Sequence, residues 1–141
     1  MSSINKSETE YKGIYIYFCD QLEKRIFQIY KHLTKNAPKA SNILLCNKET
    51  TNEELTAFLY RSILCEYNSC FIIGGIEFIK DDNKKILLEL LNKLYDKKQE
   101  EMKSCLIILY TDKDDIIESL GLLKNKKFLQ LDEKKIDNIK K

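Results

Sequence analysis

Apolar positions between residues 13 and 131 follow two patterns, short continuous runs and stripes spaced three and four residues apart. Continuous runs rich in β-branched residues predict buried strands, and they occur at residues 13–19, 42–46, 70–77 and 104–111. The stripes predict amphipathic helices, and they lie between these runs. Strands separated by helices indicate right-handed βαβ units and a mostly parallel sheet. The pattern therefore predicts an α/β three-layer sandwich.

The predicted helices begin at polar capping signals. Asp20 followed by Glu23 has the spacing of a capping box, which predicts a helix start directly after the first strand. The pairs Thr50 with Glu53 and Thr51 with Glu54 predict the next start in the same way. A third, leucine-rich helix is expected after the polar run 81–83.

The chain divides into three predicted parts. Residues 1–12 are polar and unpatterned, so we expect a flexible N-terminal lead. Residues 13–131 form a single α/β domain with about five strands. The fifth strand is expected at 127–131, after a short helix at 114–120. Residues 132–141 are expected to be a charged, exposed tail.

Composition narrows the classes of function. The 141 residues carry a formal net charge of +2, and only two of the 24 basic residues are arginines, so a nucleic-acid partner is not expected. No apolar run approaches the ~20 residues of a membrane span, and no signal peptide is recognisable. The five cysteines show no C-x-x-C spacing, which favours reduced thiols in a cytoplasmic protein.

The residues that would hold a nucleotide are missing. A phosphate-binding loop needs closely spaced glycines and a following lysine, but the four glycines stand at positions 13, 74, 75 and 121. The first strand also turns into its helix through residues 18–21, which leaves no room for such a loop. We therefore expect no nucleotide cofactor of the P-loop or Rossmann kind.

Polar residues follow the predicted strands at the edge where parallel sheets bind ligands. Asp20, Glu77 and Asp112 are weak candidates for ligands of Mg²⁺, which prefers hard oxygen atoms. A structural interpretation competes with this one and is favoured. In it, Asp20 caps a helix, Asn47 turns a loop, and Asp112 begins the turn after the last strand. No catalytic residue is predicted. His32, the single histidine, is expected at the surface near a helix end.

One segment resembles a known family. Residues 43–55 place an LLC strand before TT and EE pairs, and the helix that follows carries Arg61. This arrangement is similar to a segment of the mysterin family, giant cytosolic proteins that combine AAA+ modules with a RING-type ubiquitin ligase. The resemblance covers about seventy residues. It implies a degenerate part of an AAA+ core, P-loop NTPase-like without the P-loop.

The resemblance also implies roles for two residues. Glu77 would lie near the acidic metal-site position, and Thr111 near the polar residue that senses phosphate, so both are vestigial candidates for cofactor binding. The chain departs from an active module because it lacks the Gly-Lys loop, an Asp-Glu pair and any RING cysteines or histidines. These departures argue against ATP hydrolysis and ubiquitin transfer by this chain.

Three readings of function remain. The leading one is a non-catalytic structural or protein-interaction module of a mysterin-like assembly, in contact with a protein partner or with neighbouring modules. The alternative is a Mg²⁺- or nucleotide-dependent enzyme that uses the strand-end carboxylates. A receiver-like signalling domain is disfavoured, because Gly74 and Gly75 stand where its phosphorylated aspartate would be.

Overall fold

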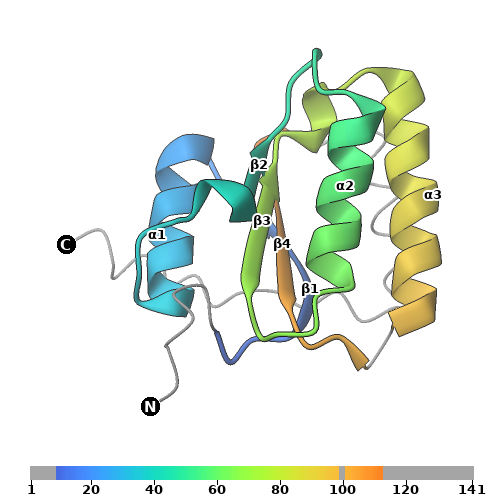
Figure 1. Ribbon diagram of the computed structural model, residues 1–141. Coiled ribbons are helices and arrows are strands. Elements are labelled where there is room, and N and C mark those ends of the chain that lie inside the picture. The colour runs from blue at the N-terminus through green and yellow to red at the C-terminus, as the bar shows by residue number, and fades with distance from the viewer. Residues whose placement is uncertain (1–8, 99–100, 113–141) are drawn as a thin grey trace.

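The computed structural model describes residues 9–98 and 101–112, and it places one sheet between two layers of helices (Figure 1). The sheet is parallel throughout, with strand order β1-β4-β3-β2. Its strands are β1 (Gly13–Phe18), β2 (Ile43–Leu45), β3 (Cys70–Gly74) and β4 (Cys105–Tyr110). Its longer helices are α1 (Leu22–Thr34), α2 (Asn52–Ile63) and α3 (Asp81–Lys98).

The predicted three-layer α/β architecture is confirmed. Helix α1 covers one face of the sheet, and α2 and α3 cover the other (Figure 1). The described residues contain four strands, against about five expected. The expected helix at 114–120 and the expected strand at 127–131 lie outside the described residues, as do most of the lead and the whole tail.

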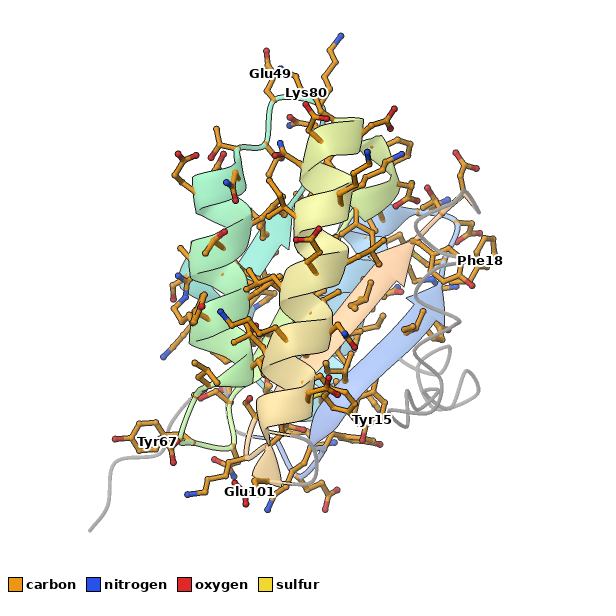
Figure 2. The ribbon with its side chains drawn as sticks, turned by 90° about the vertical axis from the view of Figure 1, so that its right-hand side faces the viewer. Tyr15, Phe18, Glu49, Tyr67, Lys80 and Glu101 are labelled. Atoms are coloured by element: carbon orange, nitrogen blue, oxygen red, sulfur yellow. The ribbon has the colours of Figure 1, made fainter. Side chains whose placement is uncertain are left out.

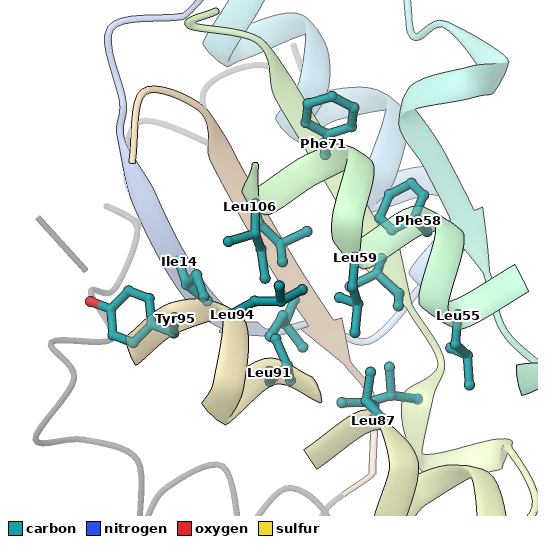
Figure 3. Packing of buried hydrophobic residues seen from close by; sticks show 14 of the residues in the cluster. Ile14, Leu55, Phe58, Leu59, Phe71, Leu87, Leu91, Leu94, Tyr95 and Leu106 are labelled. Atoms are coloured by element: carbon teal, nitrogen blue, oxygen red, sulfur yellow. The ribbon is translucent and has the colours of Figure 1, made fainter. Parts of the chain in front are cut away.

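Two hydrophobic cores hold the layers together, and they explain why the strand sequences are continuously apolar. In β4, Leu106 and Ile108 face α2 and α3, while Ile107 and Leu109 face α1. Figure 3 shows the core under α2 and α3. Its labelled residues are Ile14, Leu55, Phe58, Leu59, Phe71, Leu87, Leu91, Leu94, Tyr95 and Leu106. A strand buried on both faces cannot alternate with polar residues.

Both helices begin where they were predicted, after β1 and after β2, but only α2 has the predicted cap. The Thr51 side chain accepts a hydrogen bond from the Glu54 backbone N–H at 3.1 Å, and the Glu54 carboxylate accepts one from the Thr51 backbone N–H at 3.0 Å. For α1 the predicted Asp20 cap is wrong, because the N-cap is Gln21 and no side chain caps the helix. The Asp20 carboxylate instead lies 3.8 Å from Nε of Arg25.

Strand β3 is shorter than the continuous apolar run suggested. It ends at Gly74, because Gly75 adopts φ +78° and turns the chain into the 3-10 helix η2 (Ile76–Phe78). A second short 3-10 helix, η1 (Ala40–Asn42), precedes β2. No helix within residues 9–98 and 101–112 is both long and apolar enough to cross a bilayer.

Candidate functional site

The carboxyl ends of the four strands meet at one edge of the sheet, which is where the sequence placed its candidate residues. Backbone hydrogen bonds extend the sheet past the strand ends, from Cys19 N–H to Tyr110 C=O at 2.9 Å and from Cys46 N–H to Gly74 C=O at 2.8 Å. Gly75 N–H donates to Leu109 C=O at 3.3 Å. These bonds hold the turns that follow the strands close together.

Glu77 is the polar centre of this edge. Its side chain is 7% exposed, although glutamate is rarely buried. Oε2 accepts hydrogen bonds from Thr111 N–H at 2.7 Å and from Asp112 N–H at 3.0 Å. The Thr111 hydroxyl lies 3.3 Å from the same oxygen. The carboxylate therefore binds the backbone that follows β4 and ties it to η2.

The second carboxylate oxygen of Glu77, Oε1, differs from Oε2 in its hydrogen bonding. Oε1 is buried and has no hydrogen-bond partner among the described residues. The carboxylate also acts on its neighbours, because burial and then Glu77 raise the pKa of the Tyr110 phenol. Burial raises the pKa of the Cys46 thiol to about 12, with smaller contributions from Glu54 and Glu77. Both effects make these groups poor acids at neutral pH.

The structure joins Glu77, Thr111 and Asp112 by hydrogen bonds, whereas Asp20 is paired with Arg25 instead. Asp20 is exposed beside Arg25, whose Nη1 donates to Gln28 Oε1 at 3.1 Å. No three or more His, Cys, Asp or Glu side chains within residues 9–98 and 101–112 are grouped so that they could hold a metal ion. The candidates Asp20, Glu77 and Asp112 therefore form no such group.

Asn47 has the structural role that the sequence suggested for it. Its Oδ1 accepts a hydrogen bond from Glu49 N–H at 2.7 Å, and its own N–H donates to Thr50 Oγ1 at 2.9 Å. These bonds shape the turn between β2 and α2. His32 is half-buried near the end of α1, far along the helix from the strand ends.

Two close approaches occur at the end of β3. A Cβ atom placed on Gly74 would lie 2.9 Å from Cδ1 of Leu22, so the first residue of α1 packs directly on the end of β3. A Cβ on Gly75 would lie 2.7 Å from the Cys46 carbonyl oxygen. Gly75 is thus required by its positive φ and by the Cys46 backbone, whereas a side chain at Gly74 would have to displace the end of Leu22.

These residues do not fit the phosphates of a nucleotide. Between β1 and α1 stand only Cys19, Asp20 and Gln21, so no loop is available to direct several N–H groups at a phosphate. Leu22 occupies the position next to β3.

Sequence reasoning missed Leu22 and Arg25, which define this end of α1. Leu22 belonged to the predicted helical stripe, but nothing in the pattern indicated that it would lie against a glycine of a distant strand. Arg25 did carry a signal, because it is one of only two arginines in a lysine-rich chain. The Gly74-Gly75 pair also carried a signal, because glycines at a strand end favour a bend or a close backbone approach, and both occur.

The model of the RNF213 AAA domain family matches residues 15–127 of this chain. Among solved structures, the chain is similar to a DNA polymerase III gamma subunit-related protein from Thermotoga maritima, with 15% sequence identity and a TM-score of 0.49. That alignment covers 89% of this chain and 41% of the other, so this chain spans less than half of its length. No curated protein sequence gives a significant match.

Proposed function

This chain belongs to the RNF213 AAA domain family, the mysterin-type family that residues 43–62 resemble, and we propose that it is a non-catalytic AAA module. Its function in this proposal is contact with neighbouring modules or a protein partner in a mysterin-like ubiquitin ligase assembly in the cytoplasm. The family membership supplies the AAA-like core. The absence of catalysis is proposed from the strand-end geometry.

One observation carries the proposal: Leu22, the first residue of α1, packs on Gly74 at the end of β3. A helix that begins directly on the strand ends leaves its N-terminal N–H groups no space for a bound phosphate. Glu77 supports the same conclusion, because its Oε2 is already engaged by the backbone of Thr111 and Asp112. A glutamate used to fix a loop is not free to bind a metal through that oxygen.

The alternative is an enzyme that binds Mg²⁺ and a nucleotide at the strand ends. The observation in its favour is Glu77 Oε1, a buried carboxylate oxygen without a hydrogen-bond partner in the described residues. A buried carboxylate oxygen usually has a donor or a cation beside it.

Thermal unfolding of the full chain with and without saturating Mg-ATP distinguishes the two. A non-catalytic module should unfold at the same temperature in both samples. A ligand at 100 times its Kd adds about 2.7 kcal/mol to the unfolding free energy, which raises Tm by several degrees in a domain of this size.

Two controls make the result specific. Mg²⁺ alone and ATP with a chelator separate metal binding from nucleotide binding. If Mg-ATP raises Tm, Glu77→Gln should abolish the increase, whereas Glu49→Gln, an exposed position between β2 and α2, should retain it. That pair of results would overturn the non-catalytic proposal and place the ligand at the strand ends.

A further inference from the structure

The neighbouring strands β1 and β4 end in the same short pattern, an aromatic residue, one further residue and an aspartate. Phe18 and Tyr110 are register partners, and their rings meet edge to face with centroids 5.5 Å apart. Phe18 is 52% exposed, an unusual position for a large aromatic side chain. Figure 2 shows it at the margin of the sheet, away from the turns that carry Glu49 and Lys80.

An acidic residue follows each member of this aromatic pair in the chain. Asp20 and Asp112 lie two residues after Phe18 and Tyr110, and both are exposed. Oε2 of Glu77 accepts a hydrogen bond from the Asp112 backbone N–H. Oε1 of Glu77 has no hydrogen-bond partner among the described residues. Arg25 is the only cation paired with these acids in the described part of the chain, and it is itself buried. Among the described residues of this edge the charge is therefore negative.

We propose that this aromatic–acidic edge (Phe18, Asp20, Tyr110 and Asp112) is a docking site for a basic segment of another protein chain that also carries apolar side chains. The inference rests on the proposed contact function and names the chemistry of the partner. Aromatic rings attract ammonium and guanidinium groups, and the aspartates add charge complementarity. The exposed half of Phe18 provides apolar area for the partner to cover.

A pair of synthetic peptides tests the chemistry on the full chain. One is a twelve-residue amphipathic peptide of lysine and leucine, and the other replaces each lysine with glutamate. Fluorescence anisotropy should show binding of the lysine peptide only, and the binding should weaken as salt rises from 50 to 300 mM. A lysine–serine peptide of the same charge should bind at least about tenfold more weakly, because it lacks apolar contacts.

Variants then locate the site. Phe18→Ala should weaken the lysine–leucine peptide about tenfold, as for an exposed aromatic anchor of an interface. Asp112→Asn should weaken it about two- to fivefold, since it removes one exposed charge and leaves the backbone N–H to Glu77 in place. Tyr67→Ala is the matched control, because Tyr67 is 70% exposed and lies before β3 at the opposite end of the strands.

Three outcomes would overturn the inference. They are equal binding of the glutamate peptide, an equal loss in the Tyr67→Ala and Phe18→Ala chains, and no binding of the lysine–leucine peptide. Circular dichroism at the assay temperature establishes that each variant is folded. A failure here leaves the non-catalytic proposal standing when Mg-ATP does not change Tm, so the two failures are distinguishable.

Discussion

The turn from β1 into α1 and the turn from β2 into α2 each start a helix directly after a strand, but different contacts hold the two helix starts. Both begin at a strand end with a buried cysteine, and both have capping-box spacing in the sequence. Only α2 forms the box, between Thr51 and Glu54. Helix α1 has no side-chain cap, and its first residue rests on Gly74 instead.

The difference shows that a capping-box sequence forms its hydrogen bonds only where no contact with another part of the structure engages the capping side chain. Around α2 the capping residues are exposed, and their side chains bond to each other's backbone N–H groups. At α1 the acid that would cap the helix lies next to the Arg25 guanidinium. The following predictions test whether α1 depends on packing and α2 on capping.

The largest expected effect comes from Gly75→Ala, which disturbs the close approach of Gly75, just after β3, to the Cys46 carbonyl, just after β2. Alanine there must hold φ near +78° with its Cβ against the Cys46 carbonyl. The unfolding free energy should fall by about 3 kcal/mol, measured by urea denaturation. Gly13→Ala is the control, because Gly13 has φ +102° and no neighbour within 4 Å. It should cost about 1–2 kcal/mol, and an equal loss would contradict a role for the Cys46 contact.

Gly74→Ala tests the packing at the start of α1. Its Cβ would meet the end of the Leu22 side chain, which can move, so we expect a loss of about 1–2 kcal/mol. In a Leu22→Ala background the same change should cost close to nothing, since the clashing atoms are gone. A double-mutant cycle measures this coupling. Additive losses would show that α1 does not depend on this contact.

Removing the two possible caps compares the turns directly. Thr51→Ala should lower the unfolding free energy by about 1 kcal/mol, the usual cost of a lost helix cap. Asp20→Ala should change it by no more than about 0.5 kcal/mol, because Asp20 does not cap the helix and its carboxylate is 72% exposed and 3.8 Å from Nε of Arg25. Equal losses in urea denaturation would contradict the assigned difference.

The last effect, absent at neutral pH and visible only in alkali, concerns Cys46 and Cys19, two of the four buried cysteines. Burial raises the pKa of Cys46 to about 12 and that of Cys19 to about 11, against 9.0 for a free thiol, although Arg25 opposes the shift at Cys19. The folded chain therefore keeps a proton that the unfolded chain loses. Stability should be unaffected below pH 9 and should fall as pH rises from 9 towards 11 or 12.

Cys46→Ala should flatten this fall more than Cys19→Ala does. Urea denaturation at pH 8, 9, 10 and 11 measures the slopes. The reverse order of the two variants would indicate that Cys19 is the more strongly buried thiol.

Much of the fold could be predicted because each element carries its own signal. The apolar runs at residues 70–74 and 105–110 and the Thr51–Glu54 box need no distant residue to be interpreted. The order β1-β4-β3-β2 could not be predicted, because pairing joins residues that are far apart in the chain.

The strand-end site was only partly predictable. The family resemblance named Glu77 and Thr111 as vestigial candidates for cofactor binding, and in the structure a hydrogen bond from Thr111 N–H to Glu77 connects them. The sequence left Asp20 in the same group, because residues that follow parallel strands are expected at one edge. Asp20 instead faces the side chain of Arg25, which lies in the first turn of α1.

By itself, the sequence determined the parallel α/β architecture, the lack of a phosphate-binding loop and the membership of a mysterin-type family. These depend on periodicity, on glycine spacing and on local motifs, which are properties of short stretches of chain. Only the tertiary structure decided that Leu22 covers Gly74, that Glu77 binds the loop after β4, and that Phe18 lies exposed against Tyr110. Such contacts depend on which side chains meet when separate elements pack, and close packing permits few alternatives.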